Sequence, residues 1–232
     1  LSPTENAADA RVIYREDELY VRVAAFDRRL WYDKSPSPDE LTAWDAVSLF
    51  LDTSGNAGEA PDADSYRFEA QLVWWELRDS YQVAFTGDGG DWTSASVPFT
   101  TESFWRGNAP NDDVDDRAWG AAFKIPWQSL GLNGPPAEGT TWAMAVAVHD
   151  RDDAAGTPIA DQVWPEAMVP SQPATWGQLV FGLPAYEPPP AIPEGTTTVR
   201  HGVDGAVVVD ADVGGSSTCG STAWPEFFPT WG

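Results

Sequence analysis

The sequence predicts an all-β fold, an antiparallel β-sandwich of the jelly-roll or immunoglobulin-like type. Apolar residues recur at every second position or in short continuous blocks, a pattern that is typical of β-strands. Clusters of Gly, Pro and Asp separate these segments, and such turns join the strands of sandwiches and barrels. The single helix-like stretch, residues 126–131, is about one turn long, so helices contribute little to the predicted fold.

The predicted strands follow one another along most of the chain. Residues 11–14 and 19–26 flank a short acidic turn and are predicted to pair as a hairpin. An apolar block at residues 46–51 ends at Asp52, before a loop that contains Gly and Asn. The remaining predicted strands span residues 66–77, 81–85, 119–125, 141–149 and 178–181.

Changes in composition divide the chain into three parts. Residues 1–183 hold the predicted sandwich, and residues 184–195 form a proline-rich linker that is expected to be stiff and extended. Residues 196–232 are rich in Gly and Ser and cannot build a core of their own. They are expected either to open a second related domain or to donate a strand to another copy. Their lone cysteine, Cys219, is either free or paired between chains.

The charge of the chain limits its partners. The sequence has 36 acidic and 13 basic residues, a formal net charge of −23, which disfavours nucleic acid and anionic membranes. Divalent cations and neutral ligands such as sugars remain compatible, although solubility or adaptation to salt explains the charge equally well. No apolar run approaches the roughly 20 residues of a membrane-spanning helix. The thirteen Trp, 20 Pro and 20 Gly with few Lys favour an extracellular or cell-surface location.

Six segments of the sequence have the pattern of strands and their flanking turns. They are 17–27 (DELYVRVAAFD), 44–52 (WDAVSLFLD), 62–68 (DADSYRF), 121–127 (AAFKIPW), 145–152 (AVAVHDRD) and 176–181 (WGQLVF). In this order, over residues 9–182, they resemble the strands of carbohydrate-binding module family 9, which is a DOMON-like β-sandwich. The resemblance implies a sandwich with structural calcium that binds sugar between two tryptophans. The positions of that tryptophan pair are occupied here by Leu41 or Thr42 and by residues 169–171.

Several aromatic residues are candidates for carbohydrate binding, because an exposed Trp stacks on a pyranose ring while carboxamides bind its hydroxyls. Trp44 is the aromatic residue nearest to the first position of the family's pair. Trp92 and Trp105 flank a region rich in Gly and Asn, and Asn108 offers a carboxamide. The alternative is that these tryptophans pack in the core.

Calcium is the cofactor that the sequence favours most. Asp52, Asn56, Asp62 and Asp64 offer several hard oxygen ligands within one loop, which suits calcium coordination. Two further acidic clusters occur at residues 112–116 and 150–153, and solvated acidic turns are the alternative interpretation. Heme is an unfavoured alternative, since Met144 and His149 are five residues apart on one predicted strand and therefore face opposite sides.

The sequence therefore predicts a non-catalytic extracellular carbohydrate-binding module stabilised by calcium. With two histidines and no recognisable nucleophile motif, enzyme activity is not expected. The alternative is a structural subunit of a surface layer or extracellular fibre. In that case residues 196–232 would add a strand to a neighbouring copy.

Overall fold

The computed structural model describes residues 7–73, 78–182, 198–201 and 207–210. The chain divides into two units, Leu1–Leu183 and Pro184–Gly232. In the second unit, strand β12 (Thr198–His201) pairs antiparallel with β13 (Val207–Asp210). The predicted linker at residues 184–195, the rest of the C-terminal extension and Cys219 lie outside the described residues.

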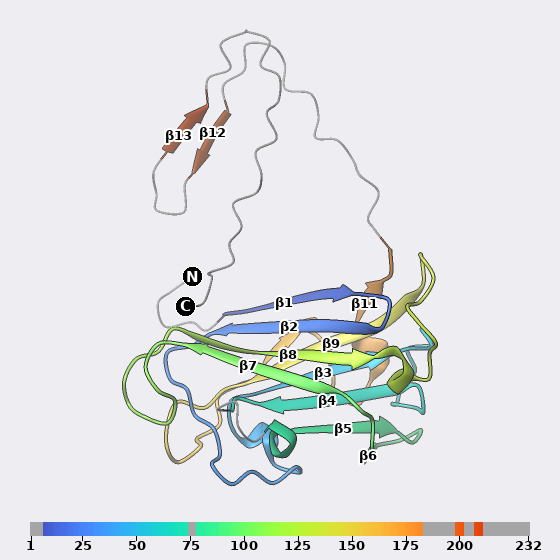
Figure 1. Cartoon of the computed structure of the whole chain (residues 1–232), viewed down its shortest axis with the longest axis horizontal. Coiled ribbons are helices and arrows are strands. Elements are labelled where there is room, and N and C mark those ends of the chain that lie inside the picture. The colour runs from blue at the N-terminus through green and yellow to red at the C-terminus, as the bar shows by residue number, and fades with distance from the viewer. Residues whose placement is uncertain (1–6, 74–77, 183–197, 202–206, 211–232) are drawn as a thin grey trace. The chain divides into compact units, whose positions relative to one another are not determined.

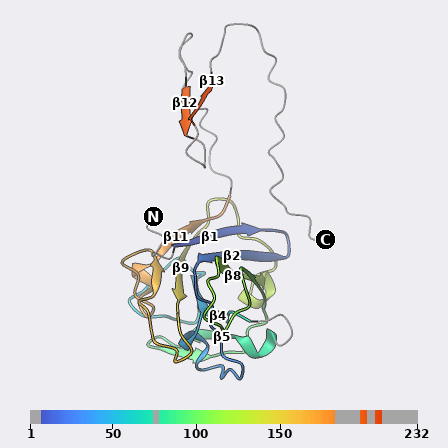
Figure 2. The same ribbon diagram turned by 90° about the vertical axis from the view of Figure 1, so that its left-hand side faces the viewer.

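The first unit is a sandwich of two antiparallel sheets (Figures 1 and 2). The smaller sheet has four strands in the order β1-β2-β8-β7. The bounds of its strands are β1 Ala7–Tyr14, β2 Glu18–Phe26, β8 Ala118–Pro126 and β7 Thr100–Arg106.

The larger sheet has seven strands, in the order β10-β9-β3-β4-β5-β6, with β11 also pairing with β9. The described connections of this unit contain four short 3-10 helices: η1 (Leu41–Ala43), η2 (Arg78–Tyr81), η3 (Trp127–Leu130) and η4 (Pro173–Thr175). The bounds of the strands are β3 Ala46–Asp52, β4 Ser65–Gln71, β5 Gln82–Gly87, β6 Trp92–Ser94, β9 Thr141–His149, β10 Gln162–Trp164 and β11 Gly177–Val180.

Alternation along each strand directs one set of side chains into the layer between the sheets. On β2, Leu19, Val21 and Val23 are fully buried, whereas Arg22 between them points outward and is exposed. On β8, Phe123 and Ile125 fill the same layer. Aromatic rings complete the core: the centroids of Trp142 and Phe181 are 4.7 Å apart in an edge-to-face contact, and Phe181 also packs on Trp127.

The structure confirms the predicted fold class and most of the strands. The hairpin is present, although β1 begins four residues before the predicted start at residue 11. The predicted strand 66–77 ends at Gln71, although the N–H of Leu72 makes one further hydrogen bond in the same register, to the carbonyl of Asp45. Residues 74–77 lie outside the described part. Strand β7 was not predicted because its sequence, TTESFWR, shows little alternation.

Among the described residues, no helix is long and apolar enough to cross a membrane.

The core position of Phe123 gives a test of the sandwich. Replacing the fully buried ring, Phe123→Ala, is expected to lower the free energy of unfolding by about 3–5 kcal/mol through lost burial and a residual cavity. The matched control is Phe26→Ala, because Phe26 is 59% exposed and its loss is expected to change stability by at most about 0.5 kcal/mol. Urea unfolding measures both, and equal effects would contradict the assignment of the core.

Candidate functional site

The outer face of the seven-stranded sheet carries a row of polar side chains next to a group of aromatic rings. In the pairing of β3 with β4, Ser48 lies opposite Glu69 and Phe50 lies opposite Arg67. Their neighbours in sequence, such as Val47, Leu49 and Phe68, fill the core, so these four side chains point away from it. Because the pairs are adjacent, polar and aromatic groups meet at the centre of the sheet.

Four residues form a hydrogen-bonded polar strip on this face: Ser48, Glu69, His149 and Asp161. The hydroxyl of Ser48 lies 2.9 Å from Nε2 of His149. The other ring nitrogen of His149, Nδ1, lies 3.0 Å from a carboxylate oxygen of Asp161. Glu69 accepts a long hydrogen bond of 3.5 Å from Ser48 and lies 3.2 Å from Nε of Arg67. Ser48 and Glu69 are buried, whereas the Asp161 side chain is 42% exposed.

The neighbouring aromatic shelf consists of Phe50, Phe85, Trp92 and Trp176. The rings of Trp92 and Trp176 are nearly parallel, at an angle of 4°, with centroids 6.3 Å apart. Phe50 contacts both rings. The guanidinium carbon of Arg67 lies 3.9 Å from the ring centroid of Phe85 and 5.4 Å from that of Trp92. Arg67 therefore links the shelf to the polar strip.

Small residues on β9 make room for the shelf. Ala143, Ala145 and Ala147 lie on the outer face of this strand and are buried under Met168 and Trp176. The indole N–H of Trp176 donates to the carbonyl of Val169 at 3.0 Å, which fixes the ring over the sheet. Larger side chains at the alanine positions would lift this covering segment.

The burial of Glu69 affects its ionisation. Burial raises the pKa of the Glu69 carboxyl, and the nearby charges of Arg67 and His149 oppose this shift only in part. The strip therefore contains a carboxylate whose negative charge is poorly solvated. Further hydrogen bonds donated to such a carboxylate would stabilise its ionised form.

The contacts from Ser48 to His149 and from His149 to Asp161 resemble those of a nucleophile, its general base and the carboxylate that orients the base. Acyl transfer also needs a hydroxyl that a substrate carbonyl can reach. Ser48 is 3% exposed in the middle of a central strand, so its hydroxyl is covered on the face where a substrate would arrive. We interpret the polar strip as a hydrogen-bond network that holds its side chains in place, and not as a catalytic triad.

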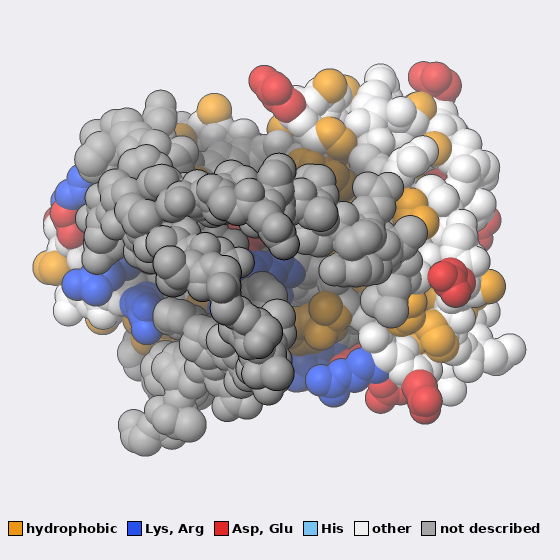
Figure 3. Space-filling view, turned by 90° about the horizontal axis from the view of Figure 1, so that it is seen from above, with side chains coloured by type: hydrophobic (Ala, Val, Ile, Leu, Met, Phe, Trp, Pro, Cys, Tyr) orange, Lys and Arg blue, Asp and Glu red, His pale blue; other side chains and the backbone are white. Residues whose placement is uncertain are grey.

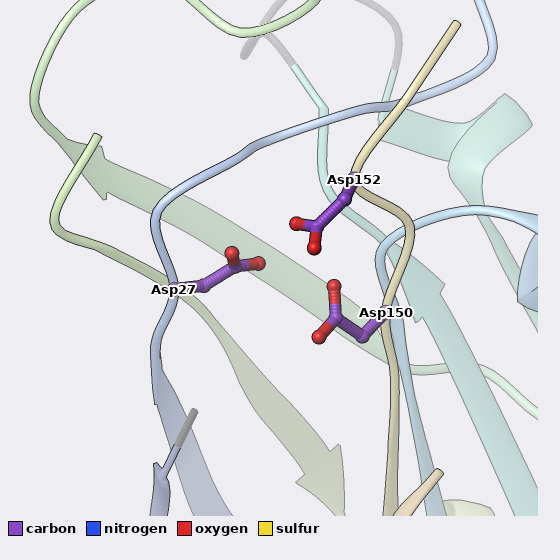
Figure 4. A group of neighbouring side chains, drawn as sticks. All are labelled: Asp27, Asp150 and Asp152. Atoms are coloured by element: carbon purple, nitrogen blue, oxygen red, sulfur yellow. The ribbon is translucent and has the colours of Figure 1, made fainter. Parts of the chain in front are cut away.

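A second cluster lies where strands of the two sheets end. Asp27 follows β2 of the smaller sheet, and Asp150 and Asp152 follow β9 of the larger one. The three carboxylates point toward a shared space, and one oxygen from each lies within 4.8 Å of the others (Figure 4). Asp27 and Asp150 are buried, and Asp152 is exposed. Three carboxylates in this arrangement fit a divalent cation with hard oxygen ligands, such as calcium.

The negative charges of the carboxylates in this cluster repel one another. Burial raises the pKa of Asp27 to about 7, and the charge of Asp150 adds to the shift. Hydrogen bonds from the N–H of Arg29 and the indole of Trp119 offset it only in part. A bound cation would favour the ionised carboxylates.

The structure does not bring the predicted carbohydrate-binding residues together. Trp92 belongs to the aromatic shelf of the larger sheet. Trp105 lies on β7 of the smaller sheet, where its indole donates to the carbonyl of Asn108 and the Asn108 amide donates to Asp112. Trp44 is half-buried beside Gly156, at the end of η1.

The predicted calcium residues do lie close together, but they bind one another. Asp62 accepts hydrogen bonds from the amide of Asn56 and from the backbone N–H of Asp64. Asp52 accepts from the hydroxyl of Ser65 and is fully buried. In the described part of the chain, the grouping of three carboxylates falls elsewhere, at Asp27, Asp150 and Asp152.

Sequence reasoning found only part of this cluster and of the polar strip. It singled out the acidic run at 150–153 but missed Asp27, which follows a strand of the other sheet. It placed Met144 and His149 on opposite faces, and the structure agrees: Met144 is in the core and His149 in the outer strip. Ser48 and Glu69 meet because of the register in which β3 pairs with β4, and the sequence alone does not predict that register.

No protein-family model matches the sequence, and no curated protein matches it by sequence. Solved structures do match the coordinates. A family 9 carbohydrate-binding module from Caldicellulosiruptor kristjanssonii in complex with glucose aligns with a TM-score of 0.52 and 19% identity, over 81% of this chain and 83% of that one. The fold is that of a family 9 carbohydrate-binding module.

Two further solved structures also match the coordinates of this chain. The Caldicellulosiruptor kristjanssonii module in complex with cellotriose has a TM-score of 0.52 and 19% identity, over 83% of this chain and 84% of that one. A structure from Bacteroides uniformis has a TM-score of 0.56 and 15% identity, over 78% of this chain and 80% of that one. The sequence-based expectation of a family 9-like sandwich is thus confirmed at the level of the fold.

The buried Glu69 makes a pH-dependent contribution to stability. Because its pKa is raised in the folded state, ionising it costs stability as the pH rises above the ordinary value of 4.5. In Glu69→Gln this part of the decline is expected to disappear, so the variant loses less stability than the wild type between acidic and neutral pH. Urea unfolding at a series of pH values measures it, with the exposed Glu102→Gln as control. Parallel curves for wild type and Glu69→Gln would contradict the assignment.

Proposed function

We propose that this protein is a non-catalytic carbohydrate-binding module whose ligand, a neutral saccharide, binds on the outer face of the seven-stranded sheet. One observation carries the proposal: the polar strip and the aromatic shelf lie side by side on that face, joined by Arg67. A pyranose has apolar C–H faces and a rim of hydroxyls, so it requires both kinds of surface at once.

The residues of this face divide into those that contact the ligand and those that hold them in place. Arg67, Trp92 and Asp161 keep exposed surface and are the proposed contacts. Ser48, Glu69 and His149 lie beneath them and orient them through the hydrogen bonds of the strip. Charged groups make stronger hydrogen bonds to sugar hydroxyls than neutral groups do.

The fold and the charge of the chain support the same proposal. The net charge of −23 is compatible with a neutral ligand and unfavourable for polyanions. The family 9 module with the same fold was solved in complex with glucose and with cellotriose, so glucose and its oligomers are the first ligands to test. From its composition we also propose that the module acts outside the cell or at the cell surface.

Calcium is part of the proposal as a structural cofactor. We assign it to Asp27, Asp150 and Asp152, which come from the ends of strands in both sheets. A bound calcium ion would add positive charge beside two buried carboxylates, Asp27 and Asp150. Through these ligands it would tie the two sheets together at one end of the sandwich. The loop set Asp52, Asn56, Asp62 and Asp64 stays a prediction.

The alternative function, assembly of a fibre or surface layer through residues 196–232, also stays a prediction. Most of that segment lies outside the described residues.

Substitution on the outer face tests saccharide binding. Trp92→Ala and Asp161→Ala are each expected to weaken binding of cellotriose at least about tenfold, through lost stacking and lost hydrogen bonds. Isothermal titration calorimetry measures the affinity, and melting temperatures show that the variants remain folded.

The matched control is Trp164→Ala. Trp164 is 48% exposed and lies at a different place, beside a groove between the two sheets. Wild-type affinity in Trp164→Ala agrees with the proposal. Lost binding in Trp164→Ala, with binding kept in the two outer-face variants, would contradict it, as would a wild-type protein that binds no saccharide.

Calcium addition tests the metal site. At a calcium concentration about 100-fold above Kd, the wild type is expected to gain about 5–10 °C in melting temperature. Asp150→Asn is expected to lose most of this gain, because one of the three carboxylates is gone. Asp62→Asn is the control in the other loop and is expected to keep it. If the increase in melting temperature disappears in Asp62→Asn but not in Asp150→Asn, the calcium site lies in the loop of Asp62.

A further inference from the structure

Strand β1 is an edge strand with little protection. Among the described strands, only β2 pairs with it. The pairing runs without a bulge from Ala7, opposite Phe26, to Tyr14, opposite Leu19. Natural sheets commonly protect such edges with a proline, a bulge or a short length, because unpaired backbone groups attract another strand. At eight residues and without proline, β1 has none of these three protections.

The inner face of β1 is also uncovered. Ala8, Ala10 and Val12 line a largely apolar groove of about 380 Å³, across which lie Val146 and Trp164 of the other sheet. Figure 3 views the molecule from above, and the described residues that are visible there show hydrophobic, acidic and basic side chains interspersed. An apolar face next to a free backbone edge favours the addition of a strand.

On the outer face of the β1–β2 pair, two arginines lie opposite each other, and one of them is paired with a carboxylate. Arg11 lies directly opposite Arg22 of β2, and like charges at that position repel. Its carboxylate partner, Asp9, lies 2.7 Å away on the same strand. Both side chains are well exposed, at 77% for Arg11 and 47% for Asp9. A second carboxylate on the free side of Arg11 would offset the charge of Arg22.

We propose that β1 pairs antiparallel with β1 of a second copy, about a two-fold axis at Ala10. In this register, Asp9 of each copy lies opposite Arg11 of the other, which gives two ion pairs on the outer face. On the inner face, Ala8 lies opposite Val12 of the second copy, and Ala10 lies opposite its counterpart. The two four-stranded sheets join into one, and the apolar lining of the groove continues across the axis.

The sequence of β1 favours this register over its neighbours. Sliding one strand by two residues places Arg11 opposite Arg11 or Asp9 opposite Asp9, and both arrangements repel. A slip of one residue would pair inner-face positions with outer-face positions, so the buried face of one copy would meet the solvent face of the other. Among these neighbouring registers, the strand is therefore self-complementary only in the one centred on Ala10.

Charge reversal in the full chain tests the pairing. Sedimentation velocity over a concentration series, in buffer with moderate salt to screen the net negative charge, is expected to show a reversible wild-type dimer. Asp9→Arg and Arg11→Asp each turn two attractive pairs into two repulsive ones. Each is expected to weaken the dimer about tenfold or more.

Restoration experiments make the test specific to the register. Mixing Asp9→Arg with Arg11→Asp pairs arginine with aspartate at both positions, so a heterodimer of wild-type affinity is expected. The double variant Asp9→Arg/Arg11→Asp is expected to recover the homodimer. The matched control is Asp17→Arg, which makes the same charge change at an exposed turn position and is expected to leave the dimer intact.

Three results would overturn the proposal. The first is a wild-type chain that stays monomeric throughout the concentration series. The second is self-association that is unchanged in both single variants, which would place the contact elsewhere. The third is a dimer lost in the single variants and not regained in the mixture or in the double variant. Circular dichroism confirms in each case that the exposed substitutions leave the sandwich folded.

Discussion

Burial of one apolar layer between the two sheets is the constraint on which the other features depend. Side chains alternate along a strand, so the residues that fill this layer also decide which neighbours face outward. Because Val47 and Leu49 are buried between the sheets, Ser48 must lie on the outer face. A slip of one residue would exchange the two faces. The proposed binding surface is therefore a consequence of how the core packs.

The same packing explains why the outer face is only partly open. Small alanines on β9 allow Met168 and Trp176 to cover part of it, beside the half-buried Trp92 of the aromatic shelf. Another part keeps polar groups that hydrogen-bond to one another. At the end of the sandwich, Asp27 and Asp150 bring negative charge from both sheets into a buried place, where a cation would stabilise them. A dimer through β1 would present two outer faces, and paired sites raise apparent affinity for a polymeric ligand.

The sequence was sufficient for the fold wherever alternation was strong. Strands such as β2, β3 and β9 have long apolar patterns and were predicted nearly to the residue. The three-residue strands β6 and β10 are too short to show a period, and β7 is too polar. These three strands were not predicted because neighbouring strands hold them in the sheets, and their own residues carry no clear strand pattern.

The candidate site was less predictable, because spacing along the chain does not reveal which sheet a residue joins. Trp92 and Trp105 are near each other in sequence and yet lie on different sheets. Ser48 and His149 are far apart in sequence and yet 2.9 Å apart in space, because β3 and β9 are neighbours in the sheet. Asp27 and Asp150 meet for a related reason: the strands that precede them end at the same side of the sandwich.

Binding of a saccharide on the outer face of the seven-stranded sheet would change the NMR signals of that face. The most direct measurement is a titration of the isotope-labelled protein with cellotriose that follows its backbone amide and tryptophan indole signals. We expect the largest shifts at β3, β4 and β9 and at the indole of Trp92. Shifts confined to Trp164 and the groove beside β1, or no shifts at all, would show that a saccharide does not bind on the outer face.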